Sequence, residues 1–288
     1  MARIVESVAE MRALAAAARK EGKSIGFVPT MGALHAGHLE LMKEARKLCD
    51  LVVVSIFVNP TQFGPNEDFD AYPRTWDEDV AACRSVGVDA VFRPPVRELY
   101  PDGWGTWVEV AGVTDKLCGQ SRPTHFRGVA TVVTKLFNII QPDKAFFGQK
   151  DAQQVIVLKK MVRDLNMFHE IVMVPIVRDA DGLAKSSRNA YLSPEQRQAA
   201  LVLHQGLSKA LVMVEAGERD IATIKAAVLR HIQSVALAEV EYVEVYSFPG
   251  LAEMGLLDQA ALLAVAVRFG STRLIDNMIL TPKLHLGG

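Results

Sequence analysis

Cysteine, net charge and long hydrophobic runs are scarce in this chain of 288 residues. The three cysteines, Cys49, Cys83 and Cys118, form no CxxC motif and cannot all pair, which favours reduced thiols over a disulfide framework or a metal site. Lysine and arginine together number 32 against 33 acidic residues, a net charge of −1. The chain therefore lacks the overall positive charge of a nucleic-acid-binding domain, and we expect no nucleic-acid partner.

The hydrophobic runs are too short for a membrane protein. Residues 51–58 form one of the longest, far below the about 20 residues that span a bilayer. Glu6 and Glu10 fall within the N-terminal stretch where a signal peptide needs an uncharged apolar segment. We therefore expect no membrane partner and a cytoplasmic location. Since 50% of the residues are hydrophobic, the chain has ample material for a large core.

Short apolar segments alternate with helical patterns over residues 1–178. The expected strands cover residues 24–28, 51–58, 89–92, 144–147 and 170–174, with helices between them. Pro29 is expected to end the first strand, and Thr75-Trp76-Asp77-Glu78 is typical of a capping box. The alternation predicts a Rossmann-like α/β domain with a doubly wound parallel sheet, in which ligands bind beyond the carboxyl ends of the strands.

The pattern changes after about residue 179. A helix begins at Ser193-Pro194 and another is expected over residues 220–237. Three strand-like runs then follow one another, at residues 240–247, 261–269 and 272–280. This order predicts a smaller C-terminal α+β domain at 179–288 beside the first domain at 1–178.

The segment VPTMGALHAGH, residues 28–38, leaves the first expected strand and enters a helix. At such a position backbone N–H groups and the helix dipole can face a phosphate, and Gly32 and Gly37 permit a close approach. His35 and His38 are three residues apart and share one face of a helical turn. A lone histidine is more often an ordinary hydrogen-bonded group, but HxGH behind a strand favours two donors that stabilise charge on a phosphate.

A second candidate site is Gly148-Gln149-Lys150-Asp151, which follows the strand expected at 144–147. Lys150 is a candidate phosphate ligand. Asp151 has either a catalytic role or the simpler role of a helix N-cap. Gln154 lies three residues further on, at the same end of the sheet.

A third candidate site is Lys185-Ser186-Ser187-Arg188, which follows a turn-like Asp-Ala-Asp-Gly stretch. Two cations and two hydroxyls within four residues suit a triphosphate, because charged donors form the stronger hydrogen bonds to phosphate. A short charged loop is more often solvated surface, and the HxGH segment is what favours the binding interpretation.

A fourth candidate is Gln62 in the segment FVNPTQF, at the end of the strand expected at 51–58. An amide held between apolar neighbours can recognise a polar substrate, because a buried amide without a partner is costly. The alternative is a turn residue that faces water.

These segments, in this order, resemble the family of pantoate–β-alanine ligases (pantothenate synthetases) within the HxGH nucleotidyltransferase superfamily. The likeness spans essentially the whole chain through VPTMGALHAGH, SIFVNPTQF, the segment from Glu67-Asp68-Phe69 to Tyr72-Pro73-Arg74, THFRGVATVV, FFGQKDAQQ and GLAKSSRNAYLS. Related adenylyltransferases share HxGH but lack NPTQF and HFRGV. Two positions depart from the family pattern: Gln149 replaces a glutamate, and Lys185 replaces an apolar residue before Ser-Ser-Arg.

The resemblance implies a reaction in two half-steps. ATP and the pantoate carboxylate form an enzyme-bound pantoyl adenylate and pyrophosphate, and β-alanine then displaces AMP to give pantothenate. Attack of a carboxylate on phosphorus needs alignment and charge stabilisation rather than a protein nucleophile. The resemblance also implies a cytoplasmic homodimer whose C-terminal domain closes over the site.

The resemblance assigns residues as well. His38 takes the place of the family's proton donor, and with His35 it is expected to act chiefly as a donor to phosphate oxygens. Gln62 and Gln154 are expected to bind pantoate, Gln62 also near β-alanine. ATP is expected to contact Met31, Gly32, Ala33, Leu34, His35, Ala36, Gly37, His38, Gly148, Gln149, Lys150, Asp151, Val177, Lys185, Ser186, Ser187 and Arg188. Mg²⁺ is expected to arrive with the nucleotide rather than in a protein cage.

Two other functions stay open from the sequence. One is another HxGH adenylyltransferase, acting on phosphopantetheine or nicotinamide mononucleotide. The other is a non-catalytic nucleotide-binding module whose second domain recognises a partner. Exchange of pyrophosphate into ATP that requires pantoate separates them from the ligase. The positions of Arg122 and Arg127 are also left open by the sequence.

Overall fold

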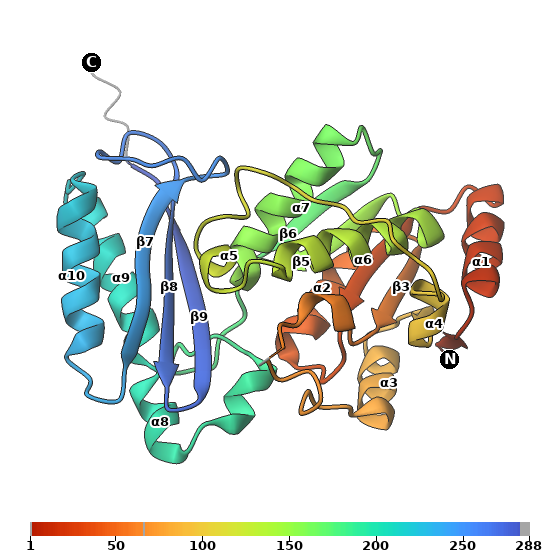
Figure 1. Cartoon of the computed structure of the whole chain (residues 1–288), viewed down its shortest axis with the longest axis horizontal. Helices are drawn as coiled ribbons and strands as arrows, with labels where there is room; N and C mark the ends of the chain where they lie inside the picture. The colour runs from red at the N-terminus through yellow and green to blue at the C-terminus, as the bar shows by residue number, and fades with distance from the viewer. Residues whose placement is uncertain (1, 66, 283–288) are drawn as a thin grey trace. The chain divides into compact units, whose positions relative to one another are not determined.

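The computed structural model describes residues 2–65 and 67–282, and the chain folds as two compact units, Met1–Pro175 and Ile176–Gly288 (Figure 1). Within the described residues, no helix combines the length and the apolar character needed to traverse a bilayer.

Six parallel strands form the sheet of the first unit. They are β1 (Arg3–Val5), β2 (Ile25–Thr30), β3 (Leu51–Ile56), β4 (Ala90–Phe92), β5 (Lys144–Gly148) and β6 (Glu170–Val174). Their order in the sheet is β1-β4-β3-β2-β5-β6. From β4 to β6 this is the Rossmann order, which changes direction between β2 and β5. Ligands bind where the direction changes, beyond the carboxyl ends of these two strands.

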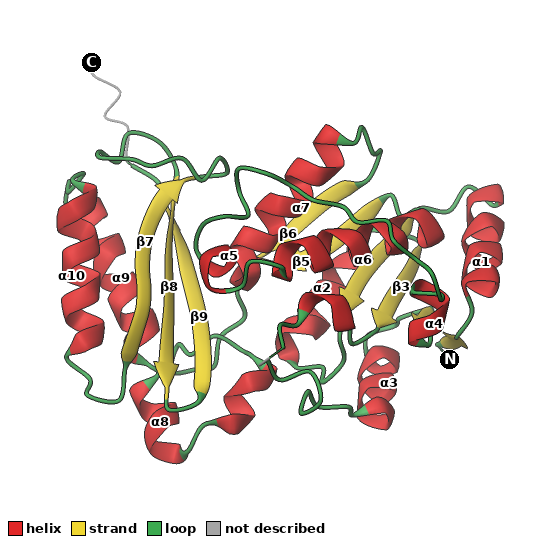
Figure 2. Ribbon diagram, viewed as in Figure 1, coloured by secondary structure: helices red, strands yellow, loops and turns green. Residues whose placement is uncertain are grey.

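Helices cover both faces of this sheet (Figure 2). On one face α6 (His125–Ile140) contacts both α1 (Val8–Lys20) and α7 (Ala152–Asp164), and on the other α2 (Ala36–Leu48) contacts α3 (Trp76–Ser85). Neighbouring strand residues point to opposite faces: the ring of Phe27 lies 6.3 Å from that of Phe137 on α6, whereas Val28 packs with the α2 core. Short helices complete the unit: η1 (Pro60–Gln62), α4 (Val96–Leu99), α5 (Cys118–Ser121) and η2 (Gln149–Asp151).

The expectation that Pro29 ends the first strand is wrong. Pro29 lies inside β2 and pairs with Ser55 of β3. On its other side β2 pairs with β5 only at Gly26 and Phe27. At Pro29, therefore, β2 has a partner strand on one side only. A proline lacks the N–H that a second partner strand would use, and one-sided pairing tolerates this.

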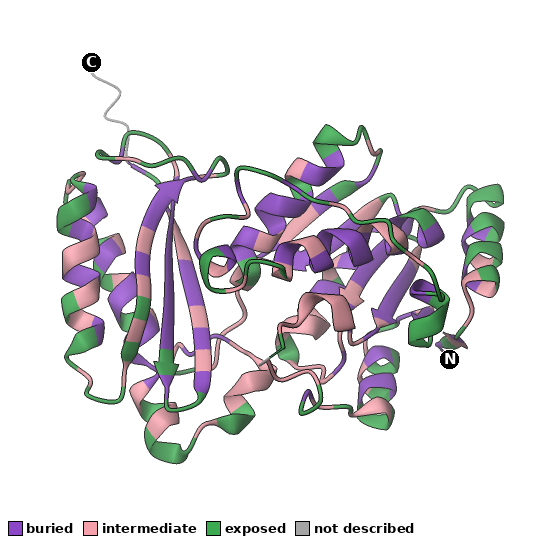
Figure 3. Cartoon of the chain, viewed as in Figure 1, coloured by how far each residue is buried: buried purple, intermediate pink, exposed green. Residues whose placement is uncertain are grey.

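The second unit packs helices on a three-stranded antiparallel sheet. Its elements are η3 (Ser187–Tyr191), α8 (Pro194–Ala199), α9 (Val202–Glu215), α10 (Ile221–Gln233), β7 (Glu239–Ser247), β8 (Ala261–Phe269) and β9 (Thr272–Leu280). The central strand β8 is buried along almost its whole length (Figure 3). Leu263, Val265 and Val267 share one hydrophobic core with Leu207 of α9 and Ile224 of α10.

The predicted fold class is confirmed: a Rossmann-like parallel sheet is followed by a smaller α+β unit. Every strand that the sequence predicted is present, with ends that match or differ by at most two residues. The sequence analysis missed β1, a strand of three residues that extends the sheet beside β4.

Candidate active site

The loop between β2 and α2 is held in a fixed conformation by a buried carboxylate. Gly32 and Ala33 have φ angles of +86° and +50°, in the left-handed region. Asp79, buried on α3, accepts hydrogen bonds from the backbone N–H groups of Ala33 at 3.0 Å and Leu34 at 2.8 Å. A Cβ atom on Gly32 would lie 2.9 Å from this carboxylate, so the loop requires glycine there.

The capping box predicted at Thr75-Trp76-Asp77-Glu78 is wrong. The Thr75 side chain makes no cap hydrogen bond, and its hydroxyl instead donates to Asp79 at 3.2 Å. The start of α3 therefore serves the β2–α2 loop. Sequence reasoning missed Asp79, because its role depends on a contact 46 residues away along the chain.

His35 and His38 form the N-terminal cap of α2. The Nδ1 atom of His35 accepts a hydrogen bond from the Gly37 N–H at 3.1 Å, and the Nδ1 atom of His38 accepts one from the His35 N–H at 3.3 Å. An Nδ1 atom that accepts a hydrogen bond carries no proton, so in this arrangement the ring proton lies on Nε2. The Nε2–H group of His38 is a donor available to a ligand.

The pKa of His38 is lowered to about 3, chiefly by burial and to a smaller extent by its neighbours His35 and Lys150. His38 is therefore neutral at physiological pH. The influence of Lys150 also shows that η2, after β5, lies near the histidine pair, after β2. The sequence analysis predicted each segment after a different strand, and the structure makes these strands, β2 and β5, neighbours in one sheet.

The helix after β5 carries two adjacent glutamines with different surroundings. Gln153 is buried; its Oε1 accepts from the Cys118 N–H at 3.0 Å, and its Nε2 donates to the carbonyls of Val113 and Lys116. Gln154, the predicted substrate ligand, is half-buried in the first turn of α7. Asp151 occupies the N-cap position, yet its exposed side chain makes no cap hydrogen bond.

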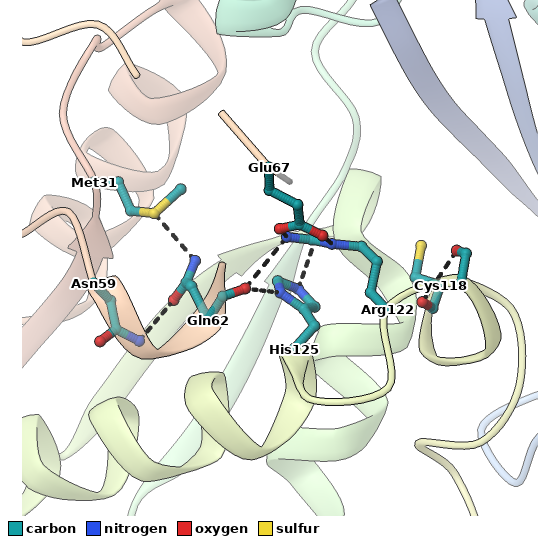
Figure 4. Close-up of polar contacts among 8 residues, drawn as sticks. Met31, Asn59, Gln62, Glu67, Cys118, Arg122 and His125 are labelled. Atoms are coloured by element: carbon teal, nitrogen blue, oxygen red, sulfur yellow. Dashed lines mark hydrogen bonds and ion pairs between the residues drawn. The ribbon is translucent and has the colours of Figure 1, made fainter. Parts of the chain in front are cut away.

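Gln62 ends η1, and its amide is oriented by a buried neighbour (Figure 4). Asn59 donates from Nδ2 to Gln62 Oε1 at 3.0 Å, and its own Oδ1 accepts from Thr61 and from the Tyr100 hydroxyl. Gln62 therefore presents its NH₂ group, which donates to Met31 Sδ at 3.1 Å. Asn59 was missed at the sequence level, although an Asn before Pro-Thr is a recognisable turn and cap signal.

The start of α6 lies very close to η1. A Cβ atom on Gly128 would lie 2.2 Å from the Thr61 carbonyl oxygen, and the Gly128 carbonyl accepts a hydrogen bond from Asn59 at 3.2 Å. Only glycine permits this approach. The HFRGV segment therefore supports the loop that carries Gln62.

In the second unit, the Lys185–Arg188 loop is held by charges of its own. The Lys185 ammonium pairs with Asp179, which also pairs with Arg197 at 3.2 Å. The Lys185 N–H donates to the Val177 carbonyl at 2.9 Å, and the Ser186 hydroxyl accepts from the Arg188 N–H at 3.3 Å. The unusual lysine at position 185 thus has a partner within its own loop.

Within the described residues, no group of three or more His, Cys, Asp or Glu side chains is placed to hold a metal ion. Cys49 and Cys83 are buried and Cys118 is half-buried, and none of the three forms a disulfide within the described residues.

A glycine-bearing loop with two histidines, at the switch point of a Rossmann-ordered sheet, defines a nucleotide-binding α/β unit of the HxGH class. The family model described as pantoate-beta-alanine ligase matches residues 3–279, and the chain belongs to this family.

Individual relatives agree with the family match. The chain is 59% identical over 277 residues to a pantothenate synthetase from Pelotomaculum thermopropionicum, covering 96% of this chain and 98% of that protein. The crystal structure of pantothenate synthetase from Thermus thermophilus superposes with a TM-score of 0.92 at 44% identity, covering 97% of this chain and 100% of that one. A Francisella tularensis pantoate-beta-alanine ligase complexed with beta-gamma ATP and beta-alanine has a TM-score of 0.79 at 32% identity, with 97% and 98% coverage.

The reaction of the family is the ATP-dependent condensation of pantoate with β-alanine to pantothenate, AMP and pyrophosphate, through an enzyme-bound pantoyl adenylate. The predictions of family, enzyme class and reaction are confirmed. The match excludes the other HxGH adenylyltransferases and the non-catalytic module that the sequence alone left open.

Proposed function

We propose that the loops after β2 and β5 form the site at which this chain makes the adenylate. ATP binds along residues 31–38 and 148–151, and pantoate binds to Gln62 and Gln154. The observation that supports this assignment is the orientation of the Gln62 amide: Asn59 occupies its oxygen, so the NH₂ group is presented. A presented NH₂ group suits a carboxylate, which only accepts hydrogen bonds. In the second half-step Gln62 also lies near β-alanine.

His35 and His38 are the proposed catalytic residues. Their Nε2–H groups donate to phosphate oxygens and stabilise the charge that builds up when the pantoate carboxylate attacks the α-phosphorus and pyrophosphate leaves. A histidine whose pKa is lowered to about 3 is a neutral donor at physiological pH. His38 therefore stabilises the transition state by hydrogen bonding, and its proton stays on Nε2 unless a substrate group takes it.

ATP contacts with Val177 and Lys185–Arg188 of the second unit stay a prediction from the family resemblance. The backbone and hydroxyl groups of Ser186 and Ser187 and the Arg188 guanidinium are the proposed phosphate ligands. Lys185 is also a proposed ATP contact. Its ammonium pairs with Asp179, so it helps to hold the loop in place as well.

Mg²⁺ is proposed to accompany ATP, bound to its phosphates, where it neutralises part of their charge. The family resemblance further supports a cytoplasmic homodimer. Light scattering on the purified chain tests the dimer, since a mass near the 31.5 kDa of one chain contradicts it.

Pantoate-dependent exchange of labelled pyrophosphate into ATP tests the proposed site. Gln154→Ala is expected to raise the KM for pantoate about tenfold, the factor that about 1.4 kcal/mol gives, and to leave the KM for ATP within about twofold. Gln153→Ala is the matched structural variant: it removes a buried hydrogen-bonding amide and is expected to lower the melting temperature instead. Equal losses in pantoate and ATP usage by Gln154→Ala contradict the assignment.

A further inference from the structure

Glu67 and Arg122 form a two-point ion pair beside Gln62 (Figure 4). Arg122 donates from Nε to Glu67 Oε1 at 2.6 Å and from Nη2 to Glu67 Oε2 at 2.5 Å, and the side chains are only 19% and 26% exposed for Arg122 and Glu67. Burial raises the pKa of Glu67, but the hydrogen bonds and charge of Arg122 outweigh it, so the pKa lies below its ordinary value. The carboxylate is therefore ionised and holds the guanidinium in one orientation.

The same guanidinium reaches the backbone of Gln62 together with a histidine. Arg122 Nη2 donates to the Gln62 carbonyl oxygen at 3.3 Å, and His125 Nδ1 lies 2.9 Å from the same oxygen. Arg122 Nη1 lies 3.2 Å from His125 Nε2. Because a guanidinium only donates, His125 accepts at Nε2 and carries its proton on Nδ1, which donates to the Gln62 carbonyl.

Gln62 is thus held at two points. Asn59 fixes the oxygen of its side-chain amide, while Arg122 and His125 fix its backbone carbonyl. A 3₁₀ segment of three residues has little rigidity of its own, so the direction of the Gln62 side chain depends on such external contacts. Glu67 touches none of these Gln62 atoms; it acts through Arg122.

We propose that Glu67 is a positioning residue for pantoate: by holding Arg122 against the Gln62 carbonyl, it aims the Gln62 NH₂ group at the substrate carboxylate. This inference rests on the proposed role of Gln62 in binding pantoate. It extends the substrate site to Glu67, which lies in a segment that carries the family resemblance but to which the sequence analysis assigned no role.

Glu67→Gln tests the proposal, because it removes the charge while keeping the size of the side chain. The KM for pantoate in pyrophosphate exchange is expected to rise about tenfold, with kcat and the KM for ATP within about twofold of the unmodified enzyme. The matched control is Glu241→Gln in the second unit. Glu241 also forms a two-point pair with Arg273, at 2.7 and 2.8 Å, with side-chain exposures of 23% and 18%, and its substitution is expected to leave the KM for pantoate unchanged.

The melting temperature separates positioning from a merely structural role. Both glutamate variants lose one ion pair and are expected to lose similar thermal stability, but only Glu67→Gln is expected to change pantoate usage. An unchanged KM for pantoate in Glu67→Gln overturns the proposal, and so does an equal rise in the KM for ATP.

Gln62→Ala distinguishes this proposal from the one on which it rests. If Gln62→Ala leaves the KM for pantoate unchanged, Gln62 does not bind pantoate and both proposals fail. If Gln62→Ala raises it and Glu67→Gln does not, only the positioning role of Glu67 fails. When both single variants raise it, the double variant is expected to match Gln62→Ala alone, because Glu67 acts through Gln62. If the two single-variant increases in the KM for pantoate multiply in the double variant, Glu67 does not act through Gln62.

Discussion

His38 accepts, at Nδ1, a hydrogen bond from the backbone N–H of His35 at 3.3 Å, and the two imidazole rings lie 4.1 Å apart between centroids. Each ring therefore caps the helix through Nδ1, and a proton on Nε2 lies on the opposite nitrogen of the ring. The capping of α2 and the proposed stabilisation of phosphate charge use opposite nitrogens of the same side chains.

Variants of His38 separate these two roles. His38→Ala removes both and is expected to lower turnover by orders of magnitude without unfolding the chain. His38→Asn retains an acceptor oxygen near the Nδ1 position but no donor at Nε2, so we expect kcat to fall about 100-fold or more with little change in melting temperature. Near-normal turnover of His38→Asn, with an unchanged circular dichroism spectrum, removes the Nε2–H group from the mechanism.

Stability is expected to fall as the pH is lowered from about 7 to about 4. Burial is the main reason that the pKa values of His38 and His125 are lowered, to about 3 and about 4, from an ordinary value of 6.5. Below an ordinary pKa of about 6.5 the unfolded chain binds protons that the folded chain does not, so the free energy of unfolding decreases until the pH reaches the folded values.

Urea unfolding at about pH 7 and about pH 5 measures this loss of stability. His125→Asn is expected to show a smaller loss, because one shifted group is gone while the Asn amide keeps a donor near the Gln62 carbonyl. Burial lowers the pKa of His169 and His204 in the same direction, so part of the slope stays. An identical slope for the variant and the unmodified chain rules out a contribution from His125.

Asp79→Asn is expected to loosen the loop between β2 and α2. One of the two acceptor oxygens becomes an NH₂ group that faces a backbone N–H, which costs about 1–3 kcal/mol of stability. The KM for ATP is expected to rise, because this loop belongs to the proposed nucleotide site. Asp77→Asn serves as the control, since Asp77 is exposed in the same first turn of α3. Equal effects of the two variants contradict the anchoring role of Asp79.

Gly128→Ala is expected to separate α6 from η1. Its Cβ atom would lie 2.2 Å from the Thr61 carbonyl, and relief of this clash costs about 1–3 kcal/mol and displaces Gln62. We expect a lower melting temperature together with a higher KM for pantoate. Gly105→Ala, at an exposed site with no atom within 4 Å of the new Cβ, is expected to change neither. A Gly128→Ala enzyme with normal pantoate kinetics shows that η1 tolerates the shift.

Most of the fold could be predicted from local patterns in the sequence. Strands β2 to β9 and most of the longer helices follow from apolar runs and helical spacing, which act over a few neighbouring positions, whereas α4, α5 and the separate helix α9 were not predicted. Pro29 shows the limit of such patterns: the cost of a proline in a strand depends on whether a partner strand lies on both sides, and β5 pairs with only two residues of β2.

The candidate site likewise has features that the sequence predicted and features that only the tertiary structure showed. The sequence alone predicted that the histidines, Lys150 and Gln62 follow the ends of strands, and the resemblance assigned their roles. Only the tertiary structure showed what aims these groups: Asp79 acts across 46 residues on Ala33, and Glu67 across 55 on Arg122. Hydrogen bonds over such separations leave no periodicity in a sequence, because they depend on how the folded backbone brings two distant polar groups within about 3 Å of each other.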